Sequence, residues 1–263
     1  MRLVVDGTEV FAATGGRPFD KALPVAIFLH GSGMDSAVWA LHSRWFAHHG
    51  WSVLAVDLPG HGRSSGAALP TIATIADWID RLIETAGINE AILIGHSMGS
   101  LAALEASARH PRRVRSLGLI GTAAAMPVHA DLLSAAQAND HNAIDMVSIW
   151  GHGARATLGG SQVPGLWMLG TGARILARSK PGVLFADLAA CNDYQDGLLS
   201  AAKVTCPAVL VLGERDVMTP ARTGKDLAAA LSSAKTVVIP DAGHMLMAEH
   251  PNEVLNALIG ALV

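Results

Sequence analysis

Ser97 sits in a Gly-x-Ser-x-Gly pattern within the stretch AILIGHSMGSLAAL, residues 91–104. The apolar run Ala91 to Gly95 predicts a buried strand and residues 100–108 predict a helix, so Ser97 falls at a sharp strand-to-helix turn. Glycines at both flanks remove side chains that would clash there, and the serine hydroxyl is exposed beyond the sheet edge. A serine that only caps a helix is the alternative interpretation. The preceding strand and the following helix favour a nucleophile.

A serine hydroxyl becomes a useful nucleophile when a base takes its proton and a carboxylate orients that base. Asp216 follows the apolar run PAVLVLG, and His244 follows TVVIPDAG. Both come after the carboxyl end of a predicted strand, where open parallel sheets place their sites. The order serine, acid, histidine along the chain is typical of a nucleophile on such a turn. We therefore predict a catalytic triad of Ser97, Asp216 and His244.

Other residues compete for two of these roles. His96 is next to the nucleophile in sequence, but its side chain should point away from Ser97 at the turn, so we favour His244 as the base. Glu214 lies nearer its strand, while Asp216 has the reach of a loop residue. Two further histidines lie near the proposed site, namely His30 and His61.

The glycine-rich stretch FLHGSGM, residues 28–34, follows another apolar run. Backbone amides in such a turn can face a substrate oxygen and stabilise the negative charge that develops on it. We predict that the N–H groups of Ser32 and Met98 form this oxyanion hole. A tight turn without a catalytic role is the alternative interpretation. His30 and Gly31 of the same stretch are candidate substrate-binding residues.

Apolar, β-branched runs that alternate with segments of helical spacing must position these residues. Most runs are continuously apolar, which is typical of strands covered on both faces by helices. The alternation predicts an α/β fold with a mainly parallel sheet and right-handed crossovers. Val4, Val5, Val10 and Phe11 around Gly7 predict an antiparallel hairpin at one sheet edge.

The interval from Thr122 to Cys206 contains no predicted strand, although a parallel crossover needs only about a dozen residues. Four helix-like segments separated by Gly or Pro fill it. We therefore predict a core formed by residues 1–122 and 206–263, with residues 123–205 inserted as a helical cap, or lid.

Apolar side chains of the predicted cap are candidate walls of a substrate pocket. We assign Trp150, Trp167 and Met146 to substrate binding, without individual roles. The wider apolar set also includes Met168, Leu169 and Phe185. Ordinary helix packing against the core is the alternative interpretation for each residue. An apolar cap favours a hydrophobic acyl or aryl group in the substrate.

The composition excludes several classes of partner. Charged residues are 16% of the chain and the formal net charge is −3, which disfavours nucleic acid and anionic membranes. The longest apolar runs fall short of the roughly 20 residues of a membrane span, and the first residues do not resemble a signal peptide, so we expect a cytoplasmic protein. Cys191 and Cys206 are too few for a disulfide framework. The apolar stretch VLNALIGALV allows a monomer or a homodimer.

The chain resembles the α/β-hydrolase superfamily in five motifs. They are HGSGM at 30–34, DLPGHGRS at 57–64, GHSMGS at 95–100, GERDVMTP at 213–220 and DAGHMLMAEHP at 241–251. The resemblance implies an eight-stranded sheet whose second strand is antiparallel, with a helical cap inserted after the sixth strand. Asp57, Gly60 and Gly62 match a motif that shapes a loop near the site, and we interpret them as structural.

The same resemblance implies a serine hydrolase that cleaves carboxylic esters of small to medium hydrophobic substrates through an acyl-enzyme, with no metal and no organic cofactor. A serine at 97 speaks against haloalkane dehalogenases and epoxide hydrolases, whose nucleophile in this superfamily is a carboxylate. Carbon–carbon bond hydrolases of aromatic-ring degradation, lactonases and cofactor-free perhydrolases are alternatives. A non-catalytic ligand receptor is less favoured, because the triad and the oxyanion loop are all present.

Overall fold

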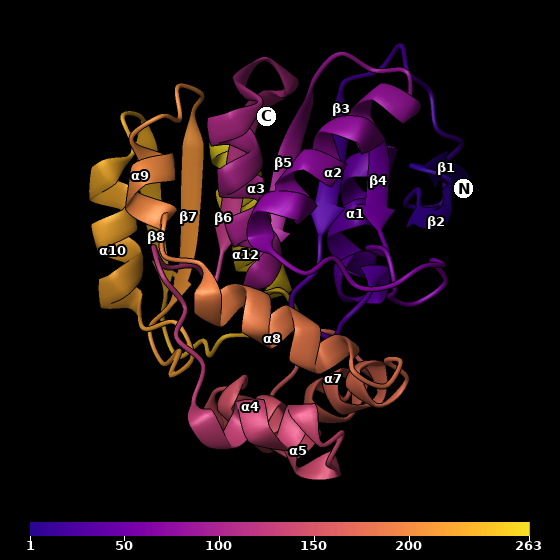
Figure 1. The fold of residues 1–263 in the computed structure, drawn as a ribbon. Coiled ribbons are helices and arrows are strands. Elements are labelled where there is room, and N and C mark those ends of the chain that lie inside the picture. Colours follow the sequence, from indigo (N-terminus) through magenta and orange to yellow (C-terminus); the bar gives the residue numbers. More distant parts are fainter. Residues whose placement is uncertain (263) are drawn as a thin grey trace.

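The computed structural model describes residues 1–262, and an eight-stranded sheet forms its centre (Figure 1). The strands are β1 (Arg2–Val5), β2 (Thr8–Ala13), β3 (Val25–Leu29), β4 (Ser52–Val56), β5 (Ala91–His96), β6 (Val114–Ile120), β7 (Ala208–Gly213) and β8 (Ala234–Ile239). Their order in space is β1-β2-β4-β3-β5-β6-β7-β8. β2 is antiparallel to β1 and to β4, and the pairs from β4 to β8 are parallel. The predicted edge hairpin and the antiparallel second strand are confirmed.

The strands in the middle of the sheet are buried on both faces. In β3, Ile27 and Leu29 pack into one hydrophobic cluster, while Ala26 and Phe28 pack into the other. Successive side chains of a strand point to opposite faces, so a continuous apolar run supplies two cores at once. β8 differs, because it is an edge strand and much of it is exposed.

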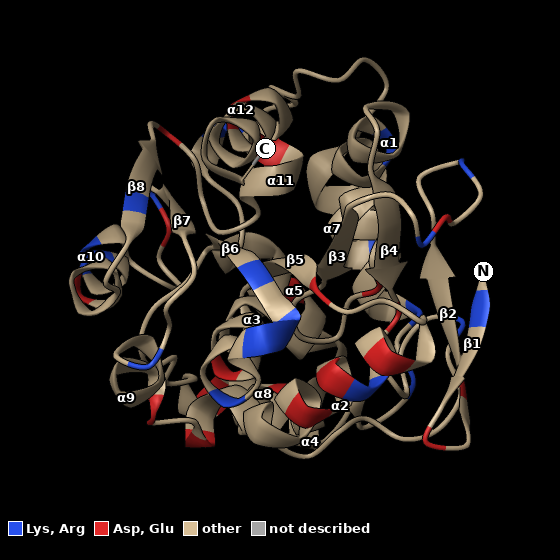
Figure 2. Cartoon of the chain, turned by 90° about the horizontal axis from the view of Figure 1, so that it is seen from above, with Lys and Arg blue, Asp and Glu red and all other residues tan. Residues whose placement is uncertain are grey.

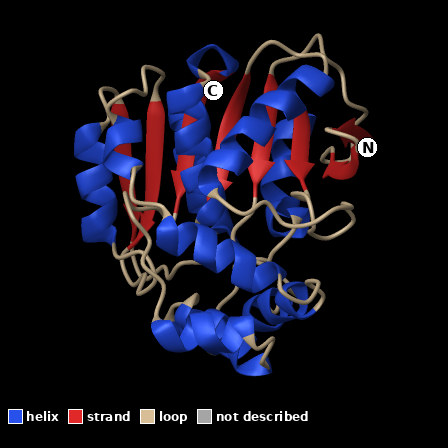
Figure 3. Ribbon diagram, in the orientation of Figure 1, coloured by secondary structure: helices blue, strands red, loops and turns tan. Residues whose placement is uncertain are grey.

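Helices cover both faces of the sheet, as Figure 3 shows by colour. The cluster with Ile27 also contains side chains of α2 (Ile72–Thr85), α3 (Met98–Arg109) and α10 (Ala221–Ala230). The cluster with Phe28 contains side chains of α1 (Ala40–His48) and α12 (Pro251–Leu262). Shorter elements are η1 (Ser36–Trp39), η2 (Pro111–Arg113) and α11 (Leu246–Glu249). The chain therefore forms an α/β/α sandwich.

Six helices between β6 and β7 form the segment that we predicted as a cap. They are α4 (Ala130–Gln137), α5 (His141–Trp150), α6 (Ala154–Thr157), α7 (Met168–Ala177), α8 (Val183–Asp193) and α9 (Gly197–Ala201). In Figure 1, α4, α5, α7 and α8 lie below the carboxyl ends of the parallel strands, whereas α9 packs beside α3 and α10. These four helices, α4, α5, α7 and α8, thus cover the sheet edge at which the candidate triad lies.

Charged residues of both signs are interspersed along the chain (Figure 2). Two arginines pair with acids of α2: Arg109, the last residue of α3, with Asp77 at 2.8 Å, and Arg113, the last residue of η2, with Asp80 at 2.7 Å. Within residues 1–262, no helix is both long enough and apolar enough to cross a membrane.

Candidate active site

Ser97 lies at the turn between β5 and α3, with a backbone φ of 52° and ψ of −120°. Residues other than glycine rarely adopt this conformation. The flanking glycines make so tight a turn possible, because a Cβ on Gly95 would lie 2.1 Å from the Gly99 carbonyl oxygen. A Cβ on Gly99 would lie 2.4 Å from the Leu29 carbonyl oxygen. The turn therefore places the Ser97 side chain at the carboxyl edge of the sheet.

Asp216 and His244 meet at the same edge, on the loops that follow β7 and β8. His244 Nδ1 lies 2.8 Å from Asp216 Oδ2. The other carboxylate oxygen accepts the N–H groups of Met218 and Thr219, both at 2.8 Å. Burial alone would raise the pKa of Asp216, but the contacts with His244 and Thr219 outweigh burial and lower it. Asp216 is therefore an ionised acid at neutral pH.

The hydrogen bonds around Asp216 determine which nitrogen of His244 carries a proton. The Thr219 hydroxyl donates to Asp216 Oδ2 at 2.7 Å and lies 3.1 Å from His244 Nδ1. The Thr219 hydroxyl oxygen and Asp216 Oδ2 can both only accept a hydrogen bond from the ring, so Nδ1 holds the hydrogen. In the neutral imidazole Nε2 then has a free lone pair, as a general base requires.

The rival assignments from the sequence occupy other positions. Glu214 is exposed and its carboxylate accepts the N–H of Asp241 at 3.1 Å. His96 is buried, and its Nε2 donates to the backbone carbonyl of His244 at 2.9 Å. Burial, together with the neighbouring His244, lowers the pKa of His96 to about 3, so its ring is neutral. His96 therefore supports the loop that carries His244.

Ser97 and His244 line one cavity of about 500 Å³, a volume typical of small-molecule sites. Within residues 1–262, Ser97 Oγ makes no hydrogen bond to a protein atom. Catalytic hydrogen bonds in enzymes often form only when substrate is bound. A substrate in this cavity would contact both residues.

The N–H groups of Ser32 and Met98 are the predicted oxyanion donors, and neither has an acceptor within residues 1–262. The Met98 side chain is buried in the core, so only its backbone can face the site. Ser32 lines the cavity together with Ser97. Gly31 allows this close approach, because a Cβ there would lie 3.3 Å from Ser97 Cβ and 2.9 Å from His96 Nδ1. Two free amides therefore flank the candidate nucleophile.

Apolar side chains from the cap and from the loop after β7 form most of the cavity wall. They are Met126, Pro127, Val128, Leu132, Trp150, Leu188, Cys191, Val217 and Met218. The predicted candidate Trp150 is among them. A second, much smaller cavity of about 30 Å³ lies on another side of Ser97, where Gly31, Met34 and Met245 contribute to its wall. The site therefore has one large apolar side and one small side.

Three predicted substrate-binding residues lie elsewhere, and this corrects the expectation. Trp167 precedes α7 and is 70% exposed, with its ring over Gly170. Met146, in α5, packs against the hydrophobic cluster that contains Phe28. His30 is fully buried: its Nδ1 donates to the Gly31 carbonyl at 2.9 Å and its Nε2 accepts the Leu58 N–H at 3.1 Å. His30 therefore holds the backbone beneath the site.

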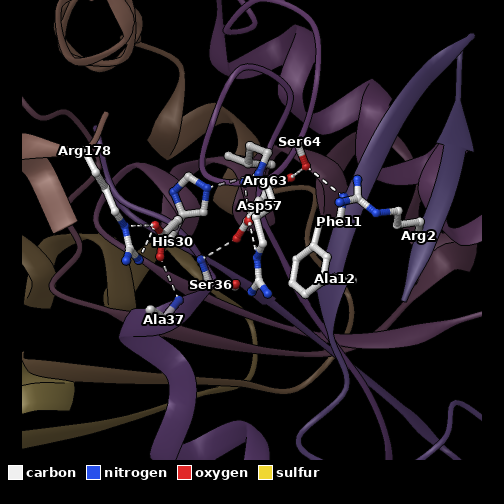
Figure 4. A network of polar contacts seen from close by, with 12 residues as sticks. Arg2, Phe11, Ala12, His30, Ser36, Ala37, Asp57, Arg63, Ser64 and Arg178 are labelled. Carbon is white, nitrogen blue, oxygen red and sulfur yellow. Dashed lines mark hydrogen bonds and ion pairs between the residues drawn. The ribbon is translucent and has the colours of Figure 1, made fainter. Parts of the chain in front are cut away.

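The loop after β4 is structural, in agreement with our interpretation of Asp57 (Figure 4). The two oxygens of the Asp57 carboxylate accept the N–H groups of Ser36 and Arg63, both at 2.8 Å. A Cβ on Gly62 would lie 2.4 Å from Asp57 Oδ2, and φ of Gly62 is +46°. This loop therefore braces the segment that carries Ser32.

Sequence reasoning missed several residues that shape the site. Thr219 completes the acid–histidine contact, and its place three residues after Asp216 is the only local signal for it. Glu249 is buried and joins the cap to the histidine loop, since its carboxylate accepts Gly153 N–H at 2.8 Å and Gly243 N–H at 3.1 Å. No pattern in the sequence indicates that Glu249 contacts Gly153 and Gly243.

Comparison with known proteins agrees with this architecture. A family model described as alpha/beta hydrolase fold matches residues 24–251. The chain belongs to this family of hydrolases.

Individual relatives differ in what they hydrolyse. The pimeloyl-(acyl-carrier protein) methyl ester esterase of Chromobacterium violaceum is 32% identical over 250 residues, which cover 89% of this chain and 92% of that protein. The enol-lactonase of Burkholderia xenovorans superposes with a TM-score of 0.88 at 23% identity, over 99% of this chain and 98% of that one. An esterase of Exiguobacterium antarcticum has a TM-score of 0.85 at 16% identity, over 99% and 98%. The two structures share the fold.

Proposed function

We propose that the protein is a carboxylic ester hydrolase that acts on small to medium hydrophobic esters through an acyl-enzyme on Ser97. One observation carries the proposal: Ser97 and an Asp216-oriented His244 line the same apolar cavity, with two free backbone amides beside the serine. This arrangement combines a nucleophile, a base and a site for an oxyanion. The esterase relatives support the same reaction class.

In the proposed mechanism, His244 Nε2 takes the Ser97 proton while Oγ attacks the ester carbonyl carbon. The N–H groups of Ser32 and Met98 stabilise the tetrahedral oxyanion. The C–O bond to the alcohol then breaks as His244 gives the proton to the leaving alkoxide oxygen. Water, deprotonated by His244, attacks the acyl-enzyme and releases the acid, and the proton returns to Ser97.

The unequal cavities support esters of a small alcohol. About 10–15 Å³ is enough to hold one water, so the cavity of about 30 Å³ suits a leaving group of about two heavy atoms. The cavity of about 500 Å³ accommodates an apolar acyl chain. A methyl ester of a medium-length acid fits both, and the relative from C. violaceum is named for a methyl ester.

A panel of esters tests the reaction class. We expect turnover of methyl butyrate and of methyl hexanoate, labelling of Ser97 by a fluorophosphonate, and loss of at least 10⁴-fold in kcat in S97A, as for other removed nucleophiles. Circular dichroism and thermal melting of S97A control for folding. Full ester turnover by S97A, or faster cleavage of a vinylogous diketone acid than of any ester, would contradict the proposal.

A second panel tests the choice of alcohol. Methyl, ethyl, butyl and benzyl hexanoates differ only in the leaving group. We expect kcat/KM to fall from methyl to benzyl. A rise along this series would show that the alcohol occupies the large cavity and the acyl group the small one.

A further inference from the structure

Helix α8 of the cap presents one face to the oxyanion loop, which we define as residues 30–34. Leu184, Asp187, Leu188 and Cys191 follow the spacing i, i+3, i+4, i+7 and share this face. Leu188 and Cys191 line the cavity, and Cys191 Sγ lies 3.8 Å from Ser32 Oγ. Asp187 is the only charged side chain of the four.

Asp187 connects the cap to two loops of the core. Its Oδ2 accepts the Gly33 N–H at 2.7 Å and lies 2.7 Å from His61 Nε2. Asp187 and His61 are 1% and 2% exposed as side chains, so this pair is shielded from water. A buried carboxylate is tolerated only when hydrogen bonds and an opposite charge compensate it. The contacts to Gly33 and His61 meet that requirement.

Gly33 depends on α8 for its packing as well. Its φ is +68°, and a Cβ would lie 2.8 Å from Leu184 Cδ1 and 3.2 Å from Leu176 Cδ2. The absence of a side chain lets α7 and α8 approach the loop directly. The hydrogen bond from Gly33 N–H to Asp187 fixes the peptide plane that immediately follows Ser32.

Neighbouring contacts attach the same part of the cap to the core. Arg178, which follows α7, donates from Nε to Asp35 Oδ2 at 2.8 Å, and Asp35 in turn accepts the Ala37 N–H at the start of η1 (Figure 4). Lys180 Nζ donates to the Ser64 carbonyl at 3.0 Å. Arg178 is 56% exposed as a side chain although its partner Asp35 is buried, whereas Asp187 and His61 are both buried.

We propose that Asp187 is a positioning residue for the oxyanion hole: through Gly33 N–H and His61 it makes the geometry of Ser32 depend on the seating of cap helix α8. The expected effect on catalysis rests on the proposed ester hydrolysis, whereas the contacts of Asp187 do not. Asp187 does not contact the reacting atoms. Its removal leaves Ser97 and His244 in place and disturbs one of the two oxyanion donors.

The charge on His61 gives the arrangement a pH dependence. Its Nδ1 faces the Pro59 carbonyl at 3.0 Å and its Nε2 faces Asp187, so both nitrogens need a hydrogen. Burial opposes the charged ring, but the Asp187 carboxylate and backbone carbonyls outweigh burial and raise the pKa of His61. The imidazolium therefore persists to higher pH than that of an ordinary histidine and is lost as the pH rises through the raised value, above the ordinary value of about 6.5.

Other titratable groups around His61 do not take over its role. The His30 ring lies 4.7 Å from the His61 ring, and burial together with the His61 charge lowers the pKa of His30 to about 4, so it is neutral. Asp57 accepts backbone N–H groups with both oxygens. Burial raises the pKa of the Cys191 thiol to about 12. His61 is therefore the cation that faces Asp187.

Two substitutions of Asp187 test the proposal, with Asp193→Asn as the matched control because Asp193 is an exposed acid on the same helix. Asp187→Leu removes both contacts, and we expect kcat at pH 7 to fall at least tenfold with KM changed less than threefold. Asp187→Asn keeps an oxygen for the Gly33 N–H but no charge. We expect wild-type kcat to fall at alkaline pH as His61 loses its proton. Asp187→Asn should retain more activity than Asp187→Leu and should lose this alkaline fall. Wild-type kcat in Asp187→Leu, or an unchanged alkaline fall in Asp187→Asn, would overturn the proposal.

Two measurements keep the test independent of ester turnover and of the folding of one variant. Amide hydrogen exchange of residues 31–36 should be at least tenfold faster in Asp187→Leu than in Asp193→Asn, and Asp187→Asn, which keeps an acceptor for the Gly33 N–H, should lie between them. The histidine NMR signals of the wild type should include one ring that titrates above the ordinary histidine value of about 6.5 and that titrates at lower pH in Asp187→Asn. If no ester is hydrolysed but these results hold, the proposed function fails and the link between Asp187 and the loop stands. Unchanged exchange and titration would remove the link whatever the activity.

Discussion

His96 donates its Nε2–H to the backbone carbonyl oxygen of His244 over 2.9 Å, and the two rings lie 4.7 Å apart. The residue next to the candidate nucleophile in sequence thus supports the residue that would activate it. The contact also joins the end of β5 to the loop after β8, which lies three strands away in the sheet. Small shifts of this loop would move His244 relative to Ser97.

Replacing His96 by Leu should lower kcat about tenfold, equivalent to about 1.4 kcal/mol, because the His244 carbonyl is then buried without its donor. His96→Gln keeps an N–H at about the same reach and should recover part of the loss. Steady-state kinetics with methyl hexanoate measure kcat in each variant. Thermal melting shows whether the substitution also changes the stability of the fold. Equal kcat in His96→Leu and the wild type would show that the contact does not position His244.

Thr219→Val should weaken the acid–histidine contact, since the hydroxyl donates to Asp216 and lies beside His244 Nδ1. One lost hydrogen bond of about 0.5–1.5 kcal/mol corresponds to a decrease in kcat of roughly 2- to 12-fold. Valine has nearly the same shape, so packing is retained. Thr219→Ser, which keeps the hydroxyl, is the control and should stay closer to the wild type.

The same substitution should change stability in acid. The pKa of Asp216 is lowered in the folded protein, so this carboxyl stabilises the fold above its unfolded value of about 3.9, and the contribution is lost as the pH falls through the folded value. Removing the Thr219 hydroxyl raises the pKa of Asp216. The midpoint of acid unfolding, followed by circular dichroism, should therefore move to higher pH in Thr219→Val. A midpoint at lower pH would contradict the argument.

Gly95→Ala should destabilise the protein by about 3 kcal/mol or more, because its Cβ would lie 2.1 Å from a backbone oxygen that cannot move without opening the turn. Gly260→Ala is the matched control, since Gly260 is in α12 and its nearest contact would be the flexible Lys235 ammonium at 3.9 Å. A helical alanine should be neutral or stabilise by up to about 1 kcal/mol. Urea unfolding compares both variants, and equal midpoints would show that the turn tolerates a side chain.

Trp150→Ala should shift the preference among methyl esters toward longer acyl chains, because Trp150 forms part of the cavity wall and the change enlarges the pocket. Trp167→Ala removes an equally large ring that is 70% exposed and should leave the preference unchanged. The ratio of kcat/KM for decanoate to butyrate measures the effect. A shift in Trp167→Ala but not in Trp150→Ala would place the acyl group elsewhere.

Much of the fold could be predicted because most strands of the parallel sheet are continuously apolar and end at a recognisable turn. The positions of Ser97, Asp216 and His244 at one edge follow from that rule, while their catalytic roles stay predictions. The choice of Asp216 over Glu214 depended on reach from the strand, and the structure places only Asp216 against His244.

The lining of the cavity could not be predicted in the same way. A helical pattern shows that one face of a cap helix is apolar, but it does not say whether that face meets the core or the cavity. Met146 and Trp150 lie on the same helix, and only Trp150 reaches the cavity. The contact between His61 and Asp187 spans 126 residues of sequence and has no local signal.

The single face of α8 has a consequence for how such enzymes diversify. Leu188 and Cys191, which line the cavity, lie within about one turn of Asp187, which contacts the oxyanion loop through Gly33. Replacing α8 by the corresponding helix of a relative would therefore change the turnover rate as well as the substrate selectivity. The cavity wall contributed by residues 126–132 makes no such contact with the oxyanion loop in the part of the chain that the structure describes. Protein engineers who wish to change substrate choice at constant rate should therefore begin with these residues.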